Sequence, residues 1–351
     1  FFILMSIDSK RLLSTSINSF ISFFIAFILS THNFGILLAV VIALHLVLPI
    51  GHPARLALGE TAGPWFFLIG IAALVLGYRW LLGRLRTKVE DKTEEKDTNA
   101  PLFSDTELNR YARHVVMREM GGQGQKALKE ASVLVVGAGG LGSPVLQYLA
   151  AAGVGTIGII DDDVVDNANL QRQVIHRDAD IGLPKVFSVQ AAMIAQNPYV
   201  TVRPYERRLT DEIAKELILE YDLVLDGCDN FETRYLLNRT CVALGKPLIS
   251  GALAQWEGQL SVFDPANNAP CYQCIFPQAP APELAPSCAE AGVIGPLPGV
   301  VGSMMAVEAI KVITGAGASL RGEMIIYDAL YGESRKITLE PRADCPICGT
   351  Q

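Results

Sequence analysis

The hydrophobic pattern divides the chain into an apolar N-terminal part and a longer part in which short apolar segments alternate with polar ones. No Asp, Glu, Lys or Arg occurs from Leu12 to Ala54, and a second uncharged run extends from Thr61 to Tyr78. Residues 64–82 would form a helix about 28 Å long, close to the thickness of the hydrocarbon layer of a bilayer. We therefore expect a membrane span at 64–82 and a second one at 34–50.

The segment between these spans, residues 51–63, is rich in Gly and Pro, which favours a helical hairpin. The apolar part of 12–29 is short for a membrane span, so a third span there is doubtful and two spans are preferred. The positive-inside rule places the end of the second span in the cytoplasm, because basic residues follow it. We therefore expect a membrane anchor at 1–86 with the catalytic domain in the cytoplasm. These basic residues are Arg79, Arg84, Arg86 and Lys88.

A charged segment separates the apolar part from the globular domain. Residues 87–103 are mostly polar and read as a flexible linker. Ser104 and Glu107 have the spacing of a capping box, which predicts a helix over 104–120. We therefore start the globular domain at residue 104 and extend it to 351.

Strands and helices alternate along this domain. A short apolar strand at 131–136 leads into a Gly-x-Gly-x-x-Gly turn at 137–142 and a helix to about residue 152. The next strand, 156–160, ends at Asp161, which follows the turn at the spacing where dinucleotide-binding folds place an acid on a ribose hydroxyl.

Further strands at 201–203 and 223–225 alternate with helices at about 186–196 and 211–219. The pattern predicts an α/β fold: a doubly wound, Rossmann-like, mostly parallel sheet. The strand ending at 225 places Asp226, Asp229 and Asn230 at the carboxyl edge, where such folds bind ligands. We expect all three side chains to point toward the glycine turn.

Composition changes this picture in two ways. Half of the 351 residues are hydrophobic and the mean hydropathy is +0.31, which agrees with a chain that meets lipid. The net charge of −7 argues against a protein that binds nucleic acid, because contacts to phosphate backbones need an excess of Lys and Arg.

Two basic residues change the expected ligand of the glycine turn. Arg172 and Lys185 follow strand ends that face the same crevice, which favours a triphosphate undergoing substitution and hence ATP. The glycine turn together with Asp161 would also suit an NAD-dependent oxidoreductase, and this alternative stays open.

The cysteines indicate a metal site. Cys271-x-x-Cys274 and Cys345-x-x-Cys348 form two matched pairs, typical of a closed, structural zinc site with four thiolates. A redox role is the alternative for each pair. Cys228 and Cys241 read as small buried residues. The remaining thiol, Cys288, lies in a Pro- and Ala-rich loop, where it is either functional or merely exposed.

Several motifs in order give the chain a resemblance to a known family. They are GAGGLG at 137–142, IIDDD at 159–163, NLQRQ at 169–173, GLPK at 182–185, DGCDN at 226–230, the two cysteine pairs, and PSCAEAGVIGPLPGVVGSMMAVEAIK at 286–311. Together they resemble the ThiF/MoeB/HesA family of ubiquitin-activating-enzyme-like adenylyltransferases. The resemblance covers about residues 104–349 and does not include the apolar N-terminal part.

The resemblance implies that the C-terminal glycine carboxylate of a small ubiquitin-like sulfur-carrier protein is adenylated with ATP and Mg²⁺. It implies catalytic roles for Asp229, which would position Mg²⁺, for Arg113, which would reach the partner subunit of a homodimer, and for Arg172 and Lys185; Cys288 matches a thiol that only some members use. It implies a nucleotide site formed by Gly137, Gly139, Gly140, Gly142, Asp161, Asn169, Arg172, Gln173, Lys185, Asp229 and Asn230, and one structural Zn²⁺ per subunit on Cys271, Cys274, Cys345 and Cys348.

The expected carrier is MoaD-like, in molybdenum cofactor biosynthesis. A ThiS-like carrier in thiamine biosynthesis is the alternative that the residues do not separate. No sulfur-transfer domain follows in the sequence, so we expect a separate sulfur donor protein. A non-enzymatic membrane adaptor that docks a ubiquitin-like protein would not need Arg172, Lys185 and Asp229 together.

Overall fold

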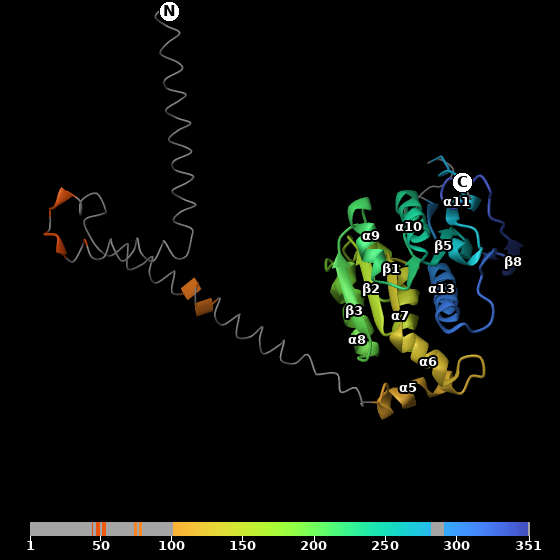
Figure 1. Cartoon of the computed structure of the whole chain (residues 1–351), viewed down its shortest axis with the longest axis horizontal. Helices are drawn as coiled ribbons and strands as arrows, with labels where there is room; N and C mark the ends of the chain where they lie inside the picture. The colour runs from red at the N-terminus through yellow and green to blue at the C-terminus, as the bar shows by residue number, and fades with distance from the viewer. Residues whose placement is uncertain are drawn as a thin grey trace, which may run out of the picture. The chain divides into compact units, whose positions relative to one another are not determined.

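The computed structural model describes residues 101–281 and 291–349, together with a few positions between 44 and 78. Most of the predicted spans at 34–50 and 64–82 therefore lies outside the described residues, as do all of 12–29 and the linker up to residue 100. The chain divides into two compact units, Phe1–Ala100 and Pro101–Gln351 (Figure 1). The fold described below is that of the second unit.

A mixed sheet of eight strands forms the centre of this unit, in the order β3-β2-β1-β4-β5-β6-β7-β8. The first five of these strands are parallel, and β6, β7 and β8 continue the sheet in antiparallel pairing. The parallel part confirms the predicted doubly wound fold. The strands are β1 (Ser132–Val136), β2 (Thr156–Asp161), β3 (Thr201–Glu206), β4 (Leu223–Asp226), β5 (Leu248–Ala254), β6 (Glu257–Phe263), β7 (Glu323–Asp328) and β8 (Glu333–Thr338).

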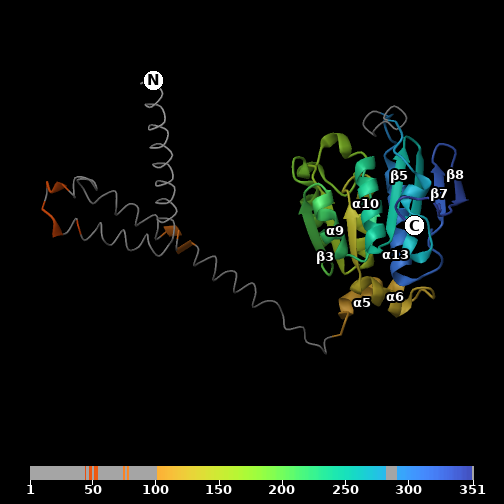
Figure 2. The same cartoon turned by 45° about the horizontal axis from the view of Figure 1, so that its top comes forward.

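Helices cover both faces of the sheet. One face packs against α7, α8 and α13, and the other against α9 and α10, which lie side by side over the parallel strands (Figure 2). Strand β1 shows why both faces are apolar: Val133 and Val135 belong to the first core, and Leu134 and Val136 to the second. The helices are α5 (Asp105–Val115), α6 (Gly121–Glu130), α7 (Gly142–Ala152), α8 (Lys185–Gln196), α9 (Asp211–Leu219), α10 (Phe231–Leu244), α11 (Tyr272–Ile275) and α13 (Pro296–Thr314).

The predicted first helix starts as expected but is shorter. Ser104 caps α5 and forms the complete capping box with Glu107. The helix ends at Val115 rather than at residue 120. Just after its end, the amide of Met117 donates a hydrogen bond to the carbonyl of His114. Gly121, with a φ of +59°, then starts α6, a helix that the glycine-rich sequence did not predict.

Within the described part of the chain, α13 alone is long and apolar enough to cross a bilayer. It packs against α7, β5 and β6 and contributes Val301 and Met305 to the first core. A core helix of a globular domain passes the same length and composition test.

Candidate functional site

The glycine turn is a tight backbone crossing between β1 and α7. Gly137 has a φ of +96°, and a Cβ on Gly142 would lie 2.0 Å from the carbonyl oxygen of Gly137. A Cβ on Gly137 would lie 2.8 Å from the carbonyl oxygen of Gly227, in the loop after β4. Side chains are therefore excluded where the loops after β1 and β4 meet, and the N-terminus of α7, which favours bound anions, lies at this edge.

Asp161 ends β2 and holds the glycine turn. Its Oδ2 accepts a hydrogen bond of 2.7 Å from the amide of Ala138, and its Oδ1 accepts one of 2.8 Å from the amide of Asp163. Burial raises the pKa of Asp161, against the effects of Lys185 and of these two amides. The predicted ribose-binding acid thus lies beside the turn.

Asn169, Arg172 and Gln173 approach the turn from the segment after β2. Arg172 donates to Asn169 Oδ1 at 2.8 Å, and its Cδ lies 3.8 Å from the place where a Cβ on Gly140 would be. Gln173 is 5% exposed, and its Oε1 has no hydrogen-bond partner within the described residues. A buried acceptor without a partner costs free energy, so this atom fits a ligand that brings a hydroxyl donor, such as a ribose.

Lys185 is the first residue of α8 rather than a loop residue. Its side chain is 5% exposed and forms an ion pair of 2.7 Å with Asp163, whose own side chain is 67% exposed. A mostly buried ammonium beside Asp161 and with one exposed partner can exchange that partner for a phosphate oxygen.

The prediction that Asp226 points toward the glycine turn is wrong. It is fully buried at the end of β4, where its Oδ2 accepts from Ser250 Oγ at 2.7 Å and pairs with Arg234 at 3.2 Å. Arg234 in turn donates to the carbonyls of Cys228 at 2.7 Å and Gly251 at 2.8 Å. Asp226 therefore holds Arg234, which in turn fixes the loop after β4 through its carbonyls. The sequence analysis did not identify Arg234 as the partner of Asp226.

Asp229 and Asn230 have different roles in this loop. Asn230 Oδ1 accepts from the amide of Thr233 at 2.9 Å and caps α10, which leaves its amide group for a ligand. Asp229 is exposed, and no hydrogen bond or ion pair holds its carboxylate within the described residues. A free carboxylate is the kind of ligand that Mg²⁺ prefers.

We call the residues gathered at this edge the glycine-loop site. Its members come from the segments after β1, β2 and β4 and from the start of α8. They are Gly137, Gly139, Gly140, Gly142, Asp161, Asn169, Arg172, Gln173, Lys185, Asp229 and Asn230.

Two predicted site residues are not in this group. Cys288 lies outside the described residues. Arg113 is exposed on α5, next to His114, whose ring contacts Gln125 at 3.0 Å. Gln125 donates to the carbonyl of Ala152 at the far end of α7. These contacts place this part of α5 next to the C-terminal end of α7, whereas the glycine turn lies at the N-terminal end of that helix.

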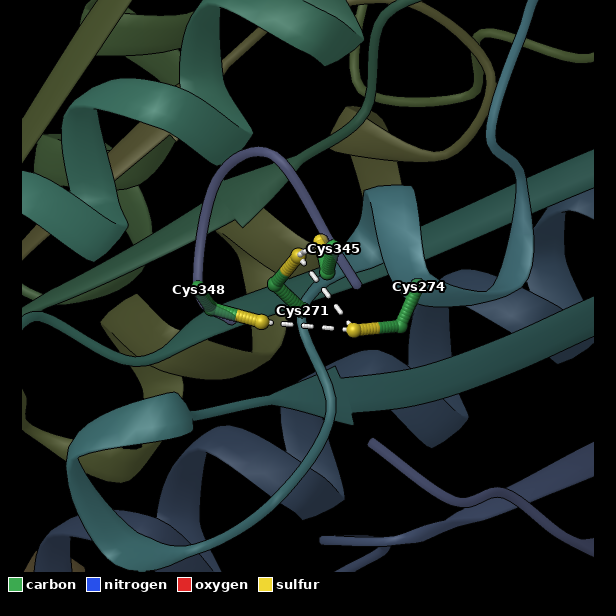
Figure 3. A group of neighbouring side chains, drawn as sticks. All are labelled: Cys271, Cys274, Cys345 and Cys348. Atoms are coloured by element: carbon green, nitrogen blue, oxygen red, sulfur yellow. Dashed lines mark hydrogen bonds between the residues drawn. The ribbon is translucent and has the colours of Figure 1, made fainter. Parts of the chain in front are cut away.

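The four predicted metal ligands form one cluster (Figure 3). Their sulfur atoms lie within 4.8 Å of one another, with separations of 3.8 Å (Cys271–Cys274), 3.6 Å (Cys271–Cys345) and 3.3 Å (Cys274–Cys348). Four sulfurs about 2.3 Å from one zinc ion would lie about 3.8 Å apart, so the cluster fits a tetrahedral zinc site.

Two amide groups donate hydrogen bonds to sulfur atoms of the cluster. The side-chain amide of Asn238 donates to Cys271 Sγ, and the backbone amide of Arg342 to Cys274 Sγ. Burial raises the pKa of Cys345, but the backbone amides of Cys348 and Ile347 and the neighbouring thiols lower it to about 7. Burial raises the pKa of Cys271 and that of Cys348, the latter to about 11. Cys241, by contrast, is buried alone, and burial raises its pKa to about 12.

Comparisons with known proteins agree with this geometry. The chain is 51% identical over 253 residues to the sulfur carrier protein adenylyltransferase of Thermus thermophilus, covering 71% of this chain and 93% of that protein. It is 47% identical to the SAMP-activating enzyme E1 of Haloferax volcanii, covering 70% of this chain and 90% of that protein. It is 46% identical to the mouse (Mus musculus) adenylyltransferase and sulfurtransferase MOCS3, covering 71% of this chain and 54% of that protein.

Among solved structures, the fold is similar to that of E. coli MccB with ATP, at a TM-score of 0.61 and 24% identity, covering 69% of this chain and 74% of that one. The sequence profile of the ThiF family matches residues 111–347, two thirds of the chain. The chain therefore belongs to the ThiF family.

Proposed function

We propose that this protein is an adenylyltransferase that uses ATP to activate the C-terminal carboxylate of a small ubiquitin-like sulfur-carrier protein. The observation that carries the proposal is the glycine-loop site, which combines a phosphate-binding turn, two cations and a free carboxylate at one sheet edge. The identity of 51% to a sulfur carrier protein adenylyltransferase, over 93% of that protein, supports the same reaction.

In this reaction a carboxylate oxygen of the carrier attacks the α-phosphorus of ATP. The bond from that phosphorus to the bridging oxygen breaks, and pyrophosphate leaves. Both reactants are anions, so the site must neutralise charge and hold them in line. Arg172, Lys185 and the N-terminus of α7 would bind the phosphates, and Asp161 would bind the ribose.

Asp229 would hold Mg²⁺, which when bound neutralises phosphate charge. Its carboxylate is exposed and has no hydrogen-bond or ion-pair partner among the described residues, which supports this role. We further propose that the cysteine cluster holds a structural Zn²⁺, since four thiols with these separations leave no position for a substrate.

We propose a homodimer in which Arg113 of one subunit serves the site of the other. The position of Arg113 at the far end of α7 supports a contribution between subunits rather than within one.

Four further proposals rest on the sequence pattern alone. The carrier is MoaD-like, with a ThiS-like carrier as the alternative, and a separate protein donates the sulfur. Cys288 is a thiol whose covalent use depends on that carrier. The uncharged runs before residue 82 anchor the domain to the membrane with the site in the cytoplasm, and fractionation of cells expressing the full chain tests this placement.

ATP–pyrophosphate exchange by the full chain, purified in detergent, tests the function. MoaD-like and ThiS-like carriers are compared, each with a form that lacks the terminal glycine. We expect exchange with one intact carrier and none with its truncated form. Exchange that is independent of any carrier would contradict the proposal, and nicotinamide binding would favour the oxidoreductase.

A further inference from the structure

A buried histidine that the proposed reaction does not use lies directly behind the glycine turn. His176 is 6% exposed. Its Nε2 lies 3.0 Å from the carbonyl oxygen of Ala138, and its Nδ1 lies 2.8 Å from Ser188 Oγ. Ser188 Oγ in turn lies 2.7 Å from Asp180 Oδ2. The three side chains form a line that starts at the glycine turn.

The proton positions along this line follow from the partners. A carbonyl oxygen only accepts, so Nε2 must carry a hydrogen and donate it to Ala138. Ser188 has one hydroxyl hydrogen, so it donates either to Nδ1 of the neutral ring or to Asp180, and not to both. In the charged ring Nδ1 donates to Ser188, which donates to Asp180. Both states keep the hydrogen on Nε2, because its partner, the carbonyl of Ala138, can only accept.

Charged groups surround His176 on several sides. Burial lowers the pKa of His176, and the nearby ammonium of Lys185 at the start of α8 lowers it further. The hydrogen bond to Ala138 and the carboxylates of Asp161 and Asp180 act in the opposite direction. Burial is the largest of these effects, so the pKa of His176 lies below its usual value.

His176 joins three parts of the glycine-loop site. It contacts Ala138 within the turn, whose amide is held from the other side by Asp161. Its own amide donates to the carbonyl of Gln173, next to Arg172. Its partner Ser188 lies on α8, one turn after Lys185. Through these contacts the buried His176 links the glycine turn to the segments that carry Arg172 and Lys185.

We propose that His176 is a positioning residue for ATP, which fixes the glycine turn relative to Arg172 and Lys185 without touching the nucleotide. The proposal rests on the proposed function, because it assumes that the turn binds ATP. By holding the carbonyl of Ala138, the imidazole sets the direction of the amides that follow in the turn. Affinity for ATP should therefore depend on a donor at the position of Nε2.

The test measures ATP binding by calorimetry, with the full chain and no carrier, and then KM values in the exchange reaction. His176→Leu removes the donor, and we expect the Kd and KM for ATP to rise at least about tenfold, which corresponds to about 1.4 kcal/mol. The KM for the carrier should not change. His176→Gln keeps an N–H donor near the position of Nε2 and should stay within about threefold of wild type.

Gln125→Leu is the matched control. Gln125 is 1% exposed and donates to the carbonyl of Ala152 at the other end of α7, so its loss removes the same kind of bond away from the site. We expect this variant to lower the thermal midpoint and to leave the Kd for ATP unchanged.

The outcomes separate the two proposals. A wild-type chain that binds no ATP would overturn the function and this inference together. ATP binding by the wild type that His176→Leu leaves unchanged would overturn the role of His176 alone. An equal loss of ATP affinity in Gln125→Leu would also overturn it, because the effect would then be a general loosening of the fold.

Discussion

The cysteine cluster and the glycine-loop site are assembled from different numbers of chain segments. The cluster needs two, each a Cys-x-x-Cys turn that brings its own sulfurs together before the two turns meet. The glycine-loop site takes residues from the ends of three parallel strands and from α8, and none of these segments is complete alone. Damage to the cluster should therefore act on stability, whereas damage to the glycine-loop site should act on ligand binding and reaction rate.

Removing the metal should have the largest effect on stability. Apparent binding free energies of structural zinc are about 10–16 kcal/mol in small zinc-dependent domains, and binding stabilises only the folded chain. We expect Cys345→Ser to lose zinc and to lose hydrogen-exchange protection around residues 271–275 and 342–349. ATP should still bind to the glycine-loop site.

Cys241→Ala is the control, since this thiol is buried outside the cluster. It should keep one zinc ion per chain by elemental analysis. Loss of ATP binding together with zinc in Cys345→Ser would show that the two sites are not separate.

Breaking the buried ion pair between Asp226 and Arg234 should have the next largest effect on stability. Arg234→Leu leaves Asp226 charged without its partner in a buried position, which costs about 3–5 kcal/mol. Denaturant unfolding measures this loss. The double variant Asp226→Leu with Arg234→Leu should regain much of it, and a double variant no more stable than Arg234→Leu would contradict the ion-pair explanation.

Removing the carboxylate of Asp229 should lower the reaction rate without lowering stability. Asp229→Ala should slow exchange about 100- to 1000-fold, since lost electrostatic stabilisation at a reacting group costs about 3–4 kcal/mol. Its carboxylate is exposed and unpaired within the described residues, so the thermal midpoint should stay the same. Glu216→Ala, which removes an exposed carboxylate from α9, should change neither quantity, and an unchanged exchange rate in Asp229→Ala would remove Asp229 from the site.

The smallest effect should come from the capping box of α5. Ser104→Ala removes the acceptor for the amide of Glu107 and should lower the free energy of unfolding by about 1 kcal/mol. Lys129 still pairs with Glu107, so the helix should remain folded. Zinc content and exchange rate should match wild type, and a change in either would mean that α5 contributes to one of the sites.

The sequence predicted those parts whose signals are local. The glycine turn has its strand and its helix, Asp161 ends β2, and the four cysteines meet as expected. The turn and Asp161 depend on spacing within one segment and on the rule that parallel strands end at one edge, and the cysteines depend on two matched Cys-x-x-Cys pairs.

The direction of Asp226 was not predictable in the same way. Strand β4 is buried on both faces, so its residues are all apolar up to Asp226 and carry no alternation of polar and apolar positions. Asp226 has the same parity as Val224, which faces the second core, and it therefore meets Arg234 and Ser250. His176 was missed because it lies in an irregular segment, and its partner in the glycine turn, Ala138, lies 38 positions away in the sequence.

The spacing of the cysteine pairs also sets an order of events during synthesis. Cys271 and Cys345 are 74 positions apart, and both β7 and β8 lie between the pairs. At about 5–20 residues per second, the first pair waits about 4–15 s for the second. All four thiols are available to a metal ion only after β7 and β8 have been synthesised, so binding of the proposed zinc ion by all four would mark a chain in which the antiparallel half of the sheet is complete in sequence.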